Sequence, residues 1–514
     1  MATVNTLVVG GGGGGGGGAA GGAGGGGYQA NTSFTVTAQA YTITVGDGGI
    51  YGGNSISGSQ GDNSIFSTIT ATGGGWGEGA TSSNNGGDGG SGGGASYRSG
   101  ATGGTGSQGG DGGLGSGAVS PYASGGGGGA GANGANSSGS QSGNGGDGTA
   151  NSISGASVTY AGGGGGAGTV QGATQGSGGA GGGGAGGSVG SPVGVSGTAN
   201  TGGGGGGGNN QSNSNGGSGG SGIVIISYKT DGSDGVSTSS TGGTITTSGS
   251  YTIHTFTSSG TWTCVLLNIT TPTAFFTFNA SDATDDVGSA DGTSTSITYS
   301  AGNAKLGANG AGFTATASVI SFPATLGIGS TLTASYSFWF KIANGDTNRR
   351  ALFSWGETGG TGIQLEIYTG GLSYYEASNG SFGYDSSNLV NDGNWHHVVL
   401  TYASGLMKCY LDNTNIWTGA GSLSLASGNA HLLGHRIYND TTNALTGSID
   451  AFGVWGSTTL TSTEVSELYN SGTGVEYPFG SSTAIKTING LAIASVKTVN
   501  GLALASVKSV NGLA

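Results

Sequence analysis

Long runs of glycine constrain the folding of this chain more than any other feature. The strand-like stretch TLVV, residues 6–9, leads directly into nine consecutive glycines at 10–18, and similar tracts recur at 161–168 and 201–208. Glycine accounts for 126 of the 514 residues, several times its usual share of roughly 7%. A run of this kind can be a phosphate-binding loop, a flexible linker or a structural element in its own right.

Two interpretations of the tracts remain open from the sequence. Gly/Ser-rich segments commonly form flexible coils. The tracts are framed, however, by strand patterns at both ends, TLVV at 6–9 and GIVIISY at 222–228. Glycine can also adopt polyproline II geometry and pack backbone against backbone. Because ordering glycine carries a high entropic cost, we expect such packing to need many mutual contacts, as in a trimer. We favour ordered packing, with mobile loops as the alternative.

The residues that follow the first tract exclude a nucleotide site. A phosphate-binding loop needs a helix that begins at the glycines and an acidic residue about twenty positions further on. Residues 19–46 show glycine and then strand patterns, and no Gly-Lys-Ser or Gly-Lys-Thr occurs in the chain. The net charge of −13 argues against a nucleic-acid partner. We also expect no membrane insertion, because no apolar stretch has the length of a membrane span.

Composition and pattern divide the chain into four regions. Residues 1–229 are expected to form a glycine-rich β domain with polyproline II-like tracts. Residues 230–265 form a connector in which YTIHTF and TWTCVLL are expected to pair as a hairpin. Residues 266–480 have ordinary composition, and strand patterns separated by turn signals predict an antiparallel β-sandwich. Residues 481–514 repeat an eleven-residue unit that contains Asn-Gly, a strong hairpin signal. The predicted fold class is therefore all-β.

Smaller features add detail to this division. The phrase TSTEVSELYNSG at 461–472 predicts one short helix with Thr461 or Ser462 as its N-cap. Cys264 and Cys409 are the two cysteines, too few for a disulfide framework; two packed thiols and a single bridge both remain open. Since one copy of the C-terminal repeat cannot bury its own apolar face, we expect the repeats to dock on another chain or on symmetry mates.

Four phrases within residues 1–229 follow one another in a fixed order: TLVVGGGGGGGGG, YTITVGDGG, SIFSTITATGGGWG and GGSGIVIISY. In this order they resemble the glycine-rich domain of phage tail fibre and adhesin-type proteins. The resemblance covers the whole region and implies a component of a virion fibre.

Residues 266–480 carry a second resemblance. TASYSFWFKI at 333–342, NDGNWHHVVLTY at 391–402 and LTGSIDAFGVWGSTTLTSTEVSELYNSG at 445–472 resemble the concanavalin A-like laminin G/pentraxin jelly roll. This resemblance implies two curved antiparallel sheets. The function that it implies is usually binding to glycans or to protein partners, or is purely structural.

The jelly-roll resemblance also implies a structural Ca²⁺. The loop NASDATDDVGSADG at 279–292 contains Asp282 and Asp285, and oxygen ligands of this kind suit calcium. The resemblance implies that Asp450 of the closing strand meets this loop around the ion; ordinary solvated carboxylates are the alternative. His396 and His397 are adjacent in a strand, point to opposite faces and cannot bind one metal ion together.

A glycan site would need exposed aromatic rings, because an aromatic face stacks on a sugar ring. The candidates are Trp355, Tyr374, Tyr375, Tyr384 and Trp417, and burial in the core is the alternative for each. Hydrolysis of a glycan would need a pair of carboxylates. Glu366 and Glu376 lie in different expected strands, so we expect no catalytic residues and no enzyme.

These inferences predict a non-enzymatic virion fibre or adhesin protein whose jelly roll attaches to a host surface through a glycan or a protein. The alternatives are a structural virion decoration without receptor binding and a cellular surface adhesin. The expected partners are two further copies in a homotrimer, other virion proteins and the host surface. The N-terminal residues lack the pattern of a classical signal peptide, and the expected location is the virion or the extracellular space.

Overall fold

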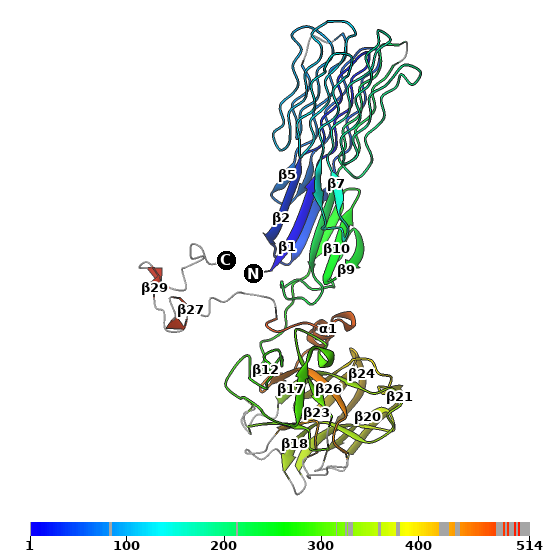
Figure 1. Cartoon of the computed structure of the whole chain (residues 1–514). Coiled ribbons are helices and arrows are strands. Elements are labelled where there is room, and N and C mark those ends of the chain that lie inside the picture. Colours follow the sequence, from blue (N-terminus) through cyan, green and yellow to red (C-terminus); the bar gives the residue numbers. More distant parts are fainter. Residues whose placement is uncertain are drawn as a thin grey trace. The chain divides into compact units, whose positions relative to one another are not determined.

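The computed structural model of the chain (Figure 1) divides into two compact units, residues 1–230 with 239–266, and residues 231–238 with 267–514. The structure describes residues 2–81, 85–211, 214–314, 316–323, 326, 333–357, 361–376, 381–403, 405–420, 431–436 and 443–479, and four two-residue strands between 487 and 503. At 356–357, 361–362, 375–376, 381–388 and 420 it describes the backbone only. Within these residues, no helix has the length and apolar character that crossing a membrane requires.

The first unit is built on two antiparallel sheets. The five-stranded sheet has the order β2 (Tyr28–Thr35), β1 (Thr3–Val9), β8 (Ile223–Lys229), β10 (Tyr251–Phe256), β9 (Thr244–Ser248). The four-stranded sheet has the order β11 (Gly260–Cys264), β3 (Gln39–Thr44), β4 (Ser64–Phe66), β5 (Ile69–Ala71). A separate hairpin joins β6 (Thr149–Asn151) and β7 (Val158–Tyr160).

The expected hairpin in the connector is wrong. β10 pairs with β8 and β9, whereas β11 pairs with β3 in the other sheet. The physical reason is the aromatic core of the unit. Trp262 of β11 is fully buried, with ring centres 5.6 Å from Tyr41 and 6.0 Å from Phe66. Residues 239–266 therefore complete the glycine-rich unit instead of forming a separate connector.

The first glycine tract donates hydrogen bonds with a period of three residues. Gly10, Gly13 and Gly16 donate to carbonyls at 27, 24 and 21. Gly11, Gly14 and Gly17 donate to carbonyls at 62, 59 and 56, and Gly12 and Gly15 donate to 220 and 217. In all three sets the acceptor number falls as the donor number rises, so these three neighbours run antiparallel to the tract. A repeat of three residues is that of the polyproline II helix.

The carbonyls of the same tract accept hydrogen bonds from three other segments. Oxygens at 11, 14 and 17 accept from N–H groups at 74, 77 and 80; oxygens at 12 and 15 accept from 49 and 52; oxygens at 13 and 16 accept from 205 and 208. These three neighbours run parallel to the tract. One glycine strand thus has six neighbours, and the tracts form an ordered lattice in which the backbone groups satisfy one another. Figure 1 shows these segments as long runs lying side by side.

Only glycine fits at the centre of this lattice. A Cβ atom at Gly12 would lie 2.1 Å from the carbonyl oxygen of Gly203, and one at Gly14 would lie 2.0 Å from that of Ile50. The expected ordered packing is confirmed for the described tracts, but it forms within one chain. This packing therefore does not require a trimer, and the oligomeric state stays a prediction.

The second unit is a sandwich of two antiparallel sheets. One sheet has the order β14 (Ile297–Ser300), β15 (Gly310–Phe313), β26 (Gly447–Trp455), β17 (Thr333–Ile342), β22 (His396–Ala403), β23 (Leu406–Leu411), β24 (Thr414–Ala420), and β12 (Ala274–Phe276) also pairs with β26. The other has the order β13 (Thr293–Thr295), β16 (Val319–Phe322), β25 (His431–Leu433), β18 (Arg350–Glu357), β19 (Thr361–Tyr368), β20 (Gly371–Glu376), β21 (Ser381–Leu389). The predicted jelly-roll architecture is confirmed.

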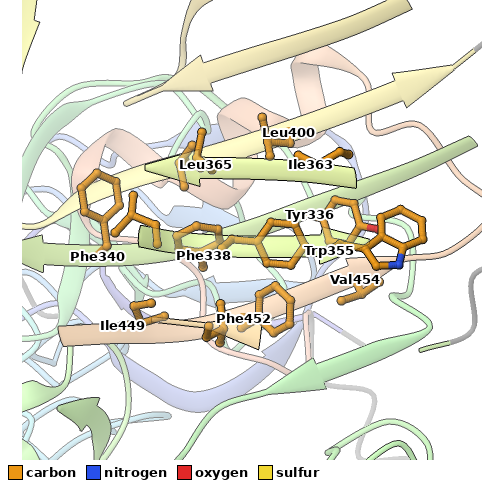
Figure 2. Packing of buried hydrophobic residues seen from close by; sticks show 14 of the residues in the cluster. Tyr336, Phe338, Phe340, Trp355, Ile363, Leu365, Leu400, Ile449, Phe452 and Val454 are labelled. Atoms are coloured by element: carbon orange, nitrogen blue, oxygen red, sulfur yellow. The ribbon is translucent and has the colours of Figure 1, made fainter. Parts of the chain in front are cut away.

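Two apolar cores hold this unit together. The main core lies between the two sheets, and Figure 2 shows Tyr336, Phe338 and Phe452 from one sheet packed against Trp355 and Leu365 from the other. Along β17 and β19 the inward-facing residues alternate with residues of the other face, as a pleated strand requires. The second core covers the outer face of the eight-stranded sheet and includes side chains of a short helix.

That helix is α1 (Ser462–Tyr469), and its N-terminus agrees with the prediction. Thr461 is the N-cap, its side chain accepts the N–H of Glu464, and the Glu464 side chain returns to the Thr461 backbone, which is a capping box. Val465 and Leu468 of α1 pack in the second core. Short 3-10 turns also occur at Ala301–Asn303 and Asn470–Gly472.

Two of the C-terminal repeats contain short antiparallel strand pairs. β27 (Thr487–Ile488) pairs with β28 (Leu491–Ala492), and β29 (Thr498–Val499) pairs with β30 (Leu502–Ala503). Each pair flanks one Asn-Gly of the sequence, although the Asn-Gly residues and the third copy lie outside the described residues. The two cysteines are buried and free of a disulfide, Cys264 in the first unit and Cys409 in the second.

Candidate binding site

The outer face of the seven-stranded sheet is the polar face of the jelly roll. The residues of β19 that point into the main core are Ile363, Leu365 and Ile367. Because side chains alternate along a strand, Gln364, Glu366 and Tyr368 lie on the opposite, outer face. The eight-stranded sheet differs, since its outer face is covered by the second apolar core.

Neighbouring strands extend this polar face. Ser354 of β18 pairs with Gln364, and Ser373 of β20 pairs with Glu366. All four side chains are buried. The Ser354 hydroxyl donates to the carbonyl of His435 over 2.8 Å, whereas the Ser373 hydroxyl has no hydrogen-bond partner among the side chains that the structure describes. A layer of buried polar groups therefore lies on the side of the sheet away from the core.

Glu366 is held between two arginines in this layer. Its Oε1 atom accepts from Arg349, with 2.9 Å to Nε and a second short contact to Nη2. Its Oε2 atom accepts from Arg436, with 3.2 Å to Nε and 3.0 Å to Nη2. The Glu366 side chain is 0% exposed, whereas Arg349 and Arg436 keep 31% and 16% of their side-chain surface exposed. Two guanidinium groups at the surface are thus fixed by one buried carboxylate.

Tyr368 places an exposed aromatic ring beside this cluster. The residue is 47% exposed, and the guanidinium carbon of Arg349 lies 5.4 Å from the centre of its ring. An aromatic face next to hydrogen-bond donors is an arrangement that suits a sugar ring and its hydroxyls. Sequence reasoning missed Tyr368 as a ligand candidate. The signal was present in the alternation of IQLEIY at 363–368, where every second residue is apolar.

The aromatic residues expected from the sequence take other positions. Trp355 and Tyr374 are buried in the main core, where Trp355 stacks on His431 with ring centres 4.7 Å apart. The expectation that these two rings are exposed is therefore wrong, because both point inward between the sheets. Trp417 is half-buried and packs on the core, 5.1 Å from the ring of Tyr374. The side chains of Tyr375 and Tyr384 lie outside the described residues.

Asp450 binds backbone N–H groups of its own unit. Its Oδ2 atom accepts from the N–H groups of Lys305 and Leu306 over 2.7 and 2.8 Å, and its Oδ1 atom accepts from Ala451 over 2.8 Å. Burial raises the pKa of Asp450 to about 7 against the effect of these three donors, and the charge of Glu476 adds to the rise. Both carboxyl oxygens face N–H donors, which is the opposite of a cation environment.

The aspartates of the 279–292 loop behave in the same way. Asp285 accepts backbone N–H groups of Phe275 and Val287 with Oδ1 and of Ala290 with Oδ2. Asp282 accepts the N–H of Thr284, two residues further along. Among the described residues, no group of three or more His, Cys, Asp or Glu side chains could hold a metal ion. The three aspartates therefore do not fit a shared calcium ion, and calcium binding itself stays a prediction.

Two hydrogen-bonded pairs that look like catalytic dyads are parts of the packing. His397 Nε2 lies 2.8 Å from the Ser337 hydroxyl. Both side chains are buried, and the ring of His397 stacks on the ring of Trp339. In the first unit, His254 Nε2 lies 2.9 Å from the Tyr228 hydroxyl in the aromatic core. Neither pair is open to a substrate.

Comparison with known proteins agrees with the division of the chain into a glycine-rich unit and a jelly roll. Residues 1–229 match the family model of a glycine-rich domain, and residues 313–466 match that of the concanavalin A-like lectin/glucanases superfamily. No curated protein matches the chain. The chain thus combines a glycine-rich domain with a concanavalin A-like domain of the laminin G type.

Solved structures of similar shape include two groups of proteins. Domain 4 of an extracellular GH43 arabinanase from Geobacillus stearothermophilus, solved with arabinotriose, is 18% identical with a TM-score of 0.34, and the match covers 40% of this chain and 100% of that domain. The receptor-binding domain of the botulinum neurotoxin C/D mosaic serotype is 14% identical with a TM-score of 0.32, covering 39% of this chain. The match spans about half of that toxin domain, 51%.

Proposed function

We propose that this chain is a non-enzymatic attachment protein of a virion fibre, in which the jelly roll binds a glycan of a host surface. The observation that carries the proposal is the exposed ring of Tyr368 beside the Arg349–Glu366–Arg436 cluster on the polar outer face of the seven-stranded sheet. The cluster offers fixed donors, and the ring offers an apolar face. Both are features of carbohydrate sites in general.

The glycine-rich unit suits a role as a rigid support. Its lattice satisfies backbone groups in many directions at once, so the unit cannot bend at the tracts without breaking hydrogen bonds. A stiff element joined to a binding module is the arrangement that a fibre needs. The match of residues 1–229 to a glycine-rich domain supports this part of the proposal.

The arrangement of carboxylates supports binding without catalysis. A glycosidase needs two carboxylates that face the same bond. Glu366 has both oxygens in ion pairs with arginines. Glu376 pairs with Ile363, three residues before Glu366 along β19, so the two glutamates are not paired across the strands.

Binding of the full chain to a printed array of microbial surface glycans tests the proposal. We expect binding that Tyr368→Ala reduces at least tenfold, with an unchanged Tm. The matched control is Leu406→Ala, which removes an exposed apolar side chain from β23 of the other sheet and should leave binding intact. Equal binding by the Tyr368→Ala variant would contradict the proposed site, and release of reducing sugar from a bound polysaccharide would contradict the non-enzymatic role.

A structural virion protein without receptor binding is the second candidate, and a cellular surface adhesin is the third. Purified protein that neither coats host cells nor blocks infection would favour the structural role. We further propose that the protein forms a homotrimer and that it associates with other virion proteins. Light scattering of the full chain measures whether the homotrimer forms.

A further inference from the structure

The glycine-rich unit contains a large cleft that the proposed function does not use. Its volume is about 760 Å³, within the range of roughly 300–1,000 Å³ that is typical of small-molecule sites. All five strands of the five-stranded sheet and the loop between β6 and β7 contribute to it. The cleft therefore lies over one face of the sheet, with the β6–β7 hairpin as a wall.

The floor of the cleft is a row of side chains across three strands. Asn5 of β1 pairs with Ser227 of β8, and Ser227 pairs with Ile253 of β10. The Asn5 amide donates to the Ser227 hydroxyl over 3.4 Å, a long contact that leaves most of the amide's hydrogen-bonding capacity for a ligand. Tyr251 lies two residues before Ile253 on the same face, since side chains alternate along a strand.

The wall of the cleft is fixed at both ends. On one side, Asn151 donates to the Tyr28 hydroxyl over 2.7 Å and accepts the N–H of Ile153 over 2.8 Å. On the other side, Gly155 has a φ of +92° and approaches Ser248 of β9 so closely that a Cβ atom would lie 2.6 Å from the serine side chain. The loop thus reaches from β2 to β9, and the cleft is formed before any ligand binds.

The chemistry of the lining is uncharged and mixed. None of the lining residues carries a charge; the polar ones have amide or hydroxyl side chains, namely Asn5, Thr6, Asn31, Thr32, Asn151, Ser152, Ser227, Ser248, Ser250 and Tyr251. Apolar surface comes from Ile153 and from the ring of Tyr251, which are partly buried, and Ile253 beneath them belongs to the buried core. The Lys229 ammonium lies 4.4 Å from the centre of that ring and donates to the Ser250 hydroxyl over 3.2 Å.

We propose that this cleft is a second binding site and that it takes a neutral oligosaccharide. Sugar hydroxyls need donors and acceptors together, which amides and hydroxyls supply. The C–H faces of sugar rings need apolar contacts, which Tyr251 and Ile153 supply. A phosphorylated or sulfated ligand would need arginine or lysine side chains in the lining. The site lies in the glycine-rich unit and does not depend on the proposed role of the jelly roll.

A variant that fills the cleft gives the sharpest test. Ala30 is exposed, lines the cleft and pairs with Leu7, whose side chain points to the same face of the sheet. Ala30→Trp therefore adds a bulky side chain without removing a bond. Tyr251→Ala removes the aromatic ring instead. Tyr51→Ala is the matched control, because Tyr51 is exposed in the same unit but does not line the cleft.

The experiment measures binding of the full chain and its variants to maltohexaose, cellohexaose, xylohexaose and mannohexaose by calorimetry, with sialyllactose and a heparin hexasaccharide as anionic probes. We expect at least one neutral probe to bind, and its affinity to fall at least tenfold in Ala30→Trp and Tyr251→Ala but not in Tyr51→Ala or Tyr368→Ala. If Tyr251→Ala does not fold, the Ala30→Trp variant decides alone. Binding of no neutral probe, binding of anionic probes only, or neutral binding that Ala30→Trp leaves unchanged would overturn the proposal. Loss in Tyr368→Ala alone would assign the binding to the jelly roll.

Discussion

The Cα atom of Gly15 packs so closely on the carbonyl oxygen of Gly206 that a Cβ atom at position 15 would lie 2.1 Å from that oxygen. Gly15 also donates to Gly217 and accepts from Gly52, over 2.9 and 2.8 Å. The residue cannot move aside without losing these bonds. For Gly15→Ala we therefore expect the free energy of unfolding to fall on the order of 2–4 kcal/mol, measured by calorimetry of the full chain.

The control for this prediction is Gly53→Ala in the same unit. There the nearest atom to a Cβ is the side-chain Oδ1 of Asn215 at 3.1 Å, and a flexible side chain can move. We expect a change below about 0.5 kcal/mol for the control. Equal losses in the two variants would mean that the lattice does not depend on close backbone contact.

The lattice also predicts how the native protein responds to a protease. Proteinase K needs an extended, accessible segment, and the tracts at 161–168 and 201–208 are buried almost throughout. Exposed apolar residues occur instead at Val119, Val170 and Val189. We expect early cleavage at those loops and not within the tracts, read by mass spectrometry of the fragments. Early cleavage inside 201–208 would show that the tract is open in solution.

The sequence favoured ordered tracts over mobile loops, but it did not predict which segments are their neighbours. Strand patterns at both ends of residues 1–229 pointed to ordered glycine, and the repeat of three residues follows from polyproline II geometry. The six partners of residues 10–17 could not be predicted, because glycine tracts carry no side-chain pattern that fixes a register. The mispredicted hairpin of YTIHTF at 251–256 with TWTCVLL at 261–267 has a different cause. Trp262 of β11 pairs with Tyr41 of β3, and these two residues lie far apart in the sequence, so no local pattern indicates the pairing.

The buried carboxylate of the jelly roll gives a prediction for stability. In Glu366→Gln a neutral side chain faces both Arg349 and Arg436. The substitution removes two charge-assisted interactions of a carboxylate that is fully buried in the native protein. Removing one partner of a buried ion pair typically costs about 3–5 kcal/mol. We expect a loss of this order in urea unfolding of the second unit. The double variant Glu366→Gln with Arg436→Gln should recover part of it, and a single variant as stable as the parent would contradict the prediction.

Local sequence patterns predict only part of the candidate site. Alternation places Trp355 beside Phe353 and Tyr374 beside Leu372 on the inner face, so period-two reasoning applied residue by residue would have found both in the core. By the same alternation, Tyr368 lies on the outer face of the seven-stranded sheet. The arginines are different. Arg349 and Arg436 are far apart in sequence and meet only because β18, β19 and β25 are neighbours in one sheet, which no local pattern reveals.

The donor set of Asp450 gives a prediction for metal removal. Its two oxygens accept three N–H groups, and the oxygens of Asp285 do the same. A cation would have to displace these donors. We therefore expect EDTA to leave the Tm of both units unchanged within experimental error, with added Ca²⁺ as the reciprocal measurement. A fall in Tm of several degrees with EDTA, restored by Ca²⁺, would show that calcium binds after all.

Two buried histidines predict the response of the jelly roll to acid. Burial lowers the pKa of His431 to about 3, and it lowers the pKa of His397 to about 3 as well. In the unfolded chain histidine titrates near 6.5, so the folded state binds fewer protons between these values. The stability that these two histidines contribute is therefore fully present above about pH 6.5 and is lost as the pH falls toward 3. Asp450, whose pKa burial raises to about 7, acts in the opposite direction, because its contribution is lost as the pH rises toward 7. The expected slope is about 1.4 kcal/mol per pH unit for each histidine.

His431→Phe separates this effect from general acid unfolding. The phenylalanine ring keeps the stacking on Trp355, where the native ring centres are 4.7 Å apart, but it cannot take up a proton. We expect the variant to lose less stability than the parent between pH 6.5 and pH 4, by roughly half of the combined slope of the two histidines. Urea unfolding followed by tryptophan fluorescence at several pH values measures this difference. If the free energy of unfolding fell equally with pH in parent and variant, protonation of His431 would not be a cause of the loss of stability in acid.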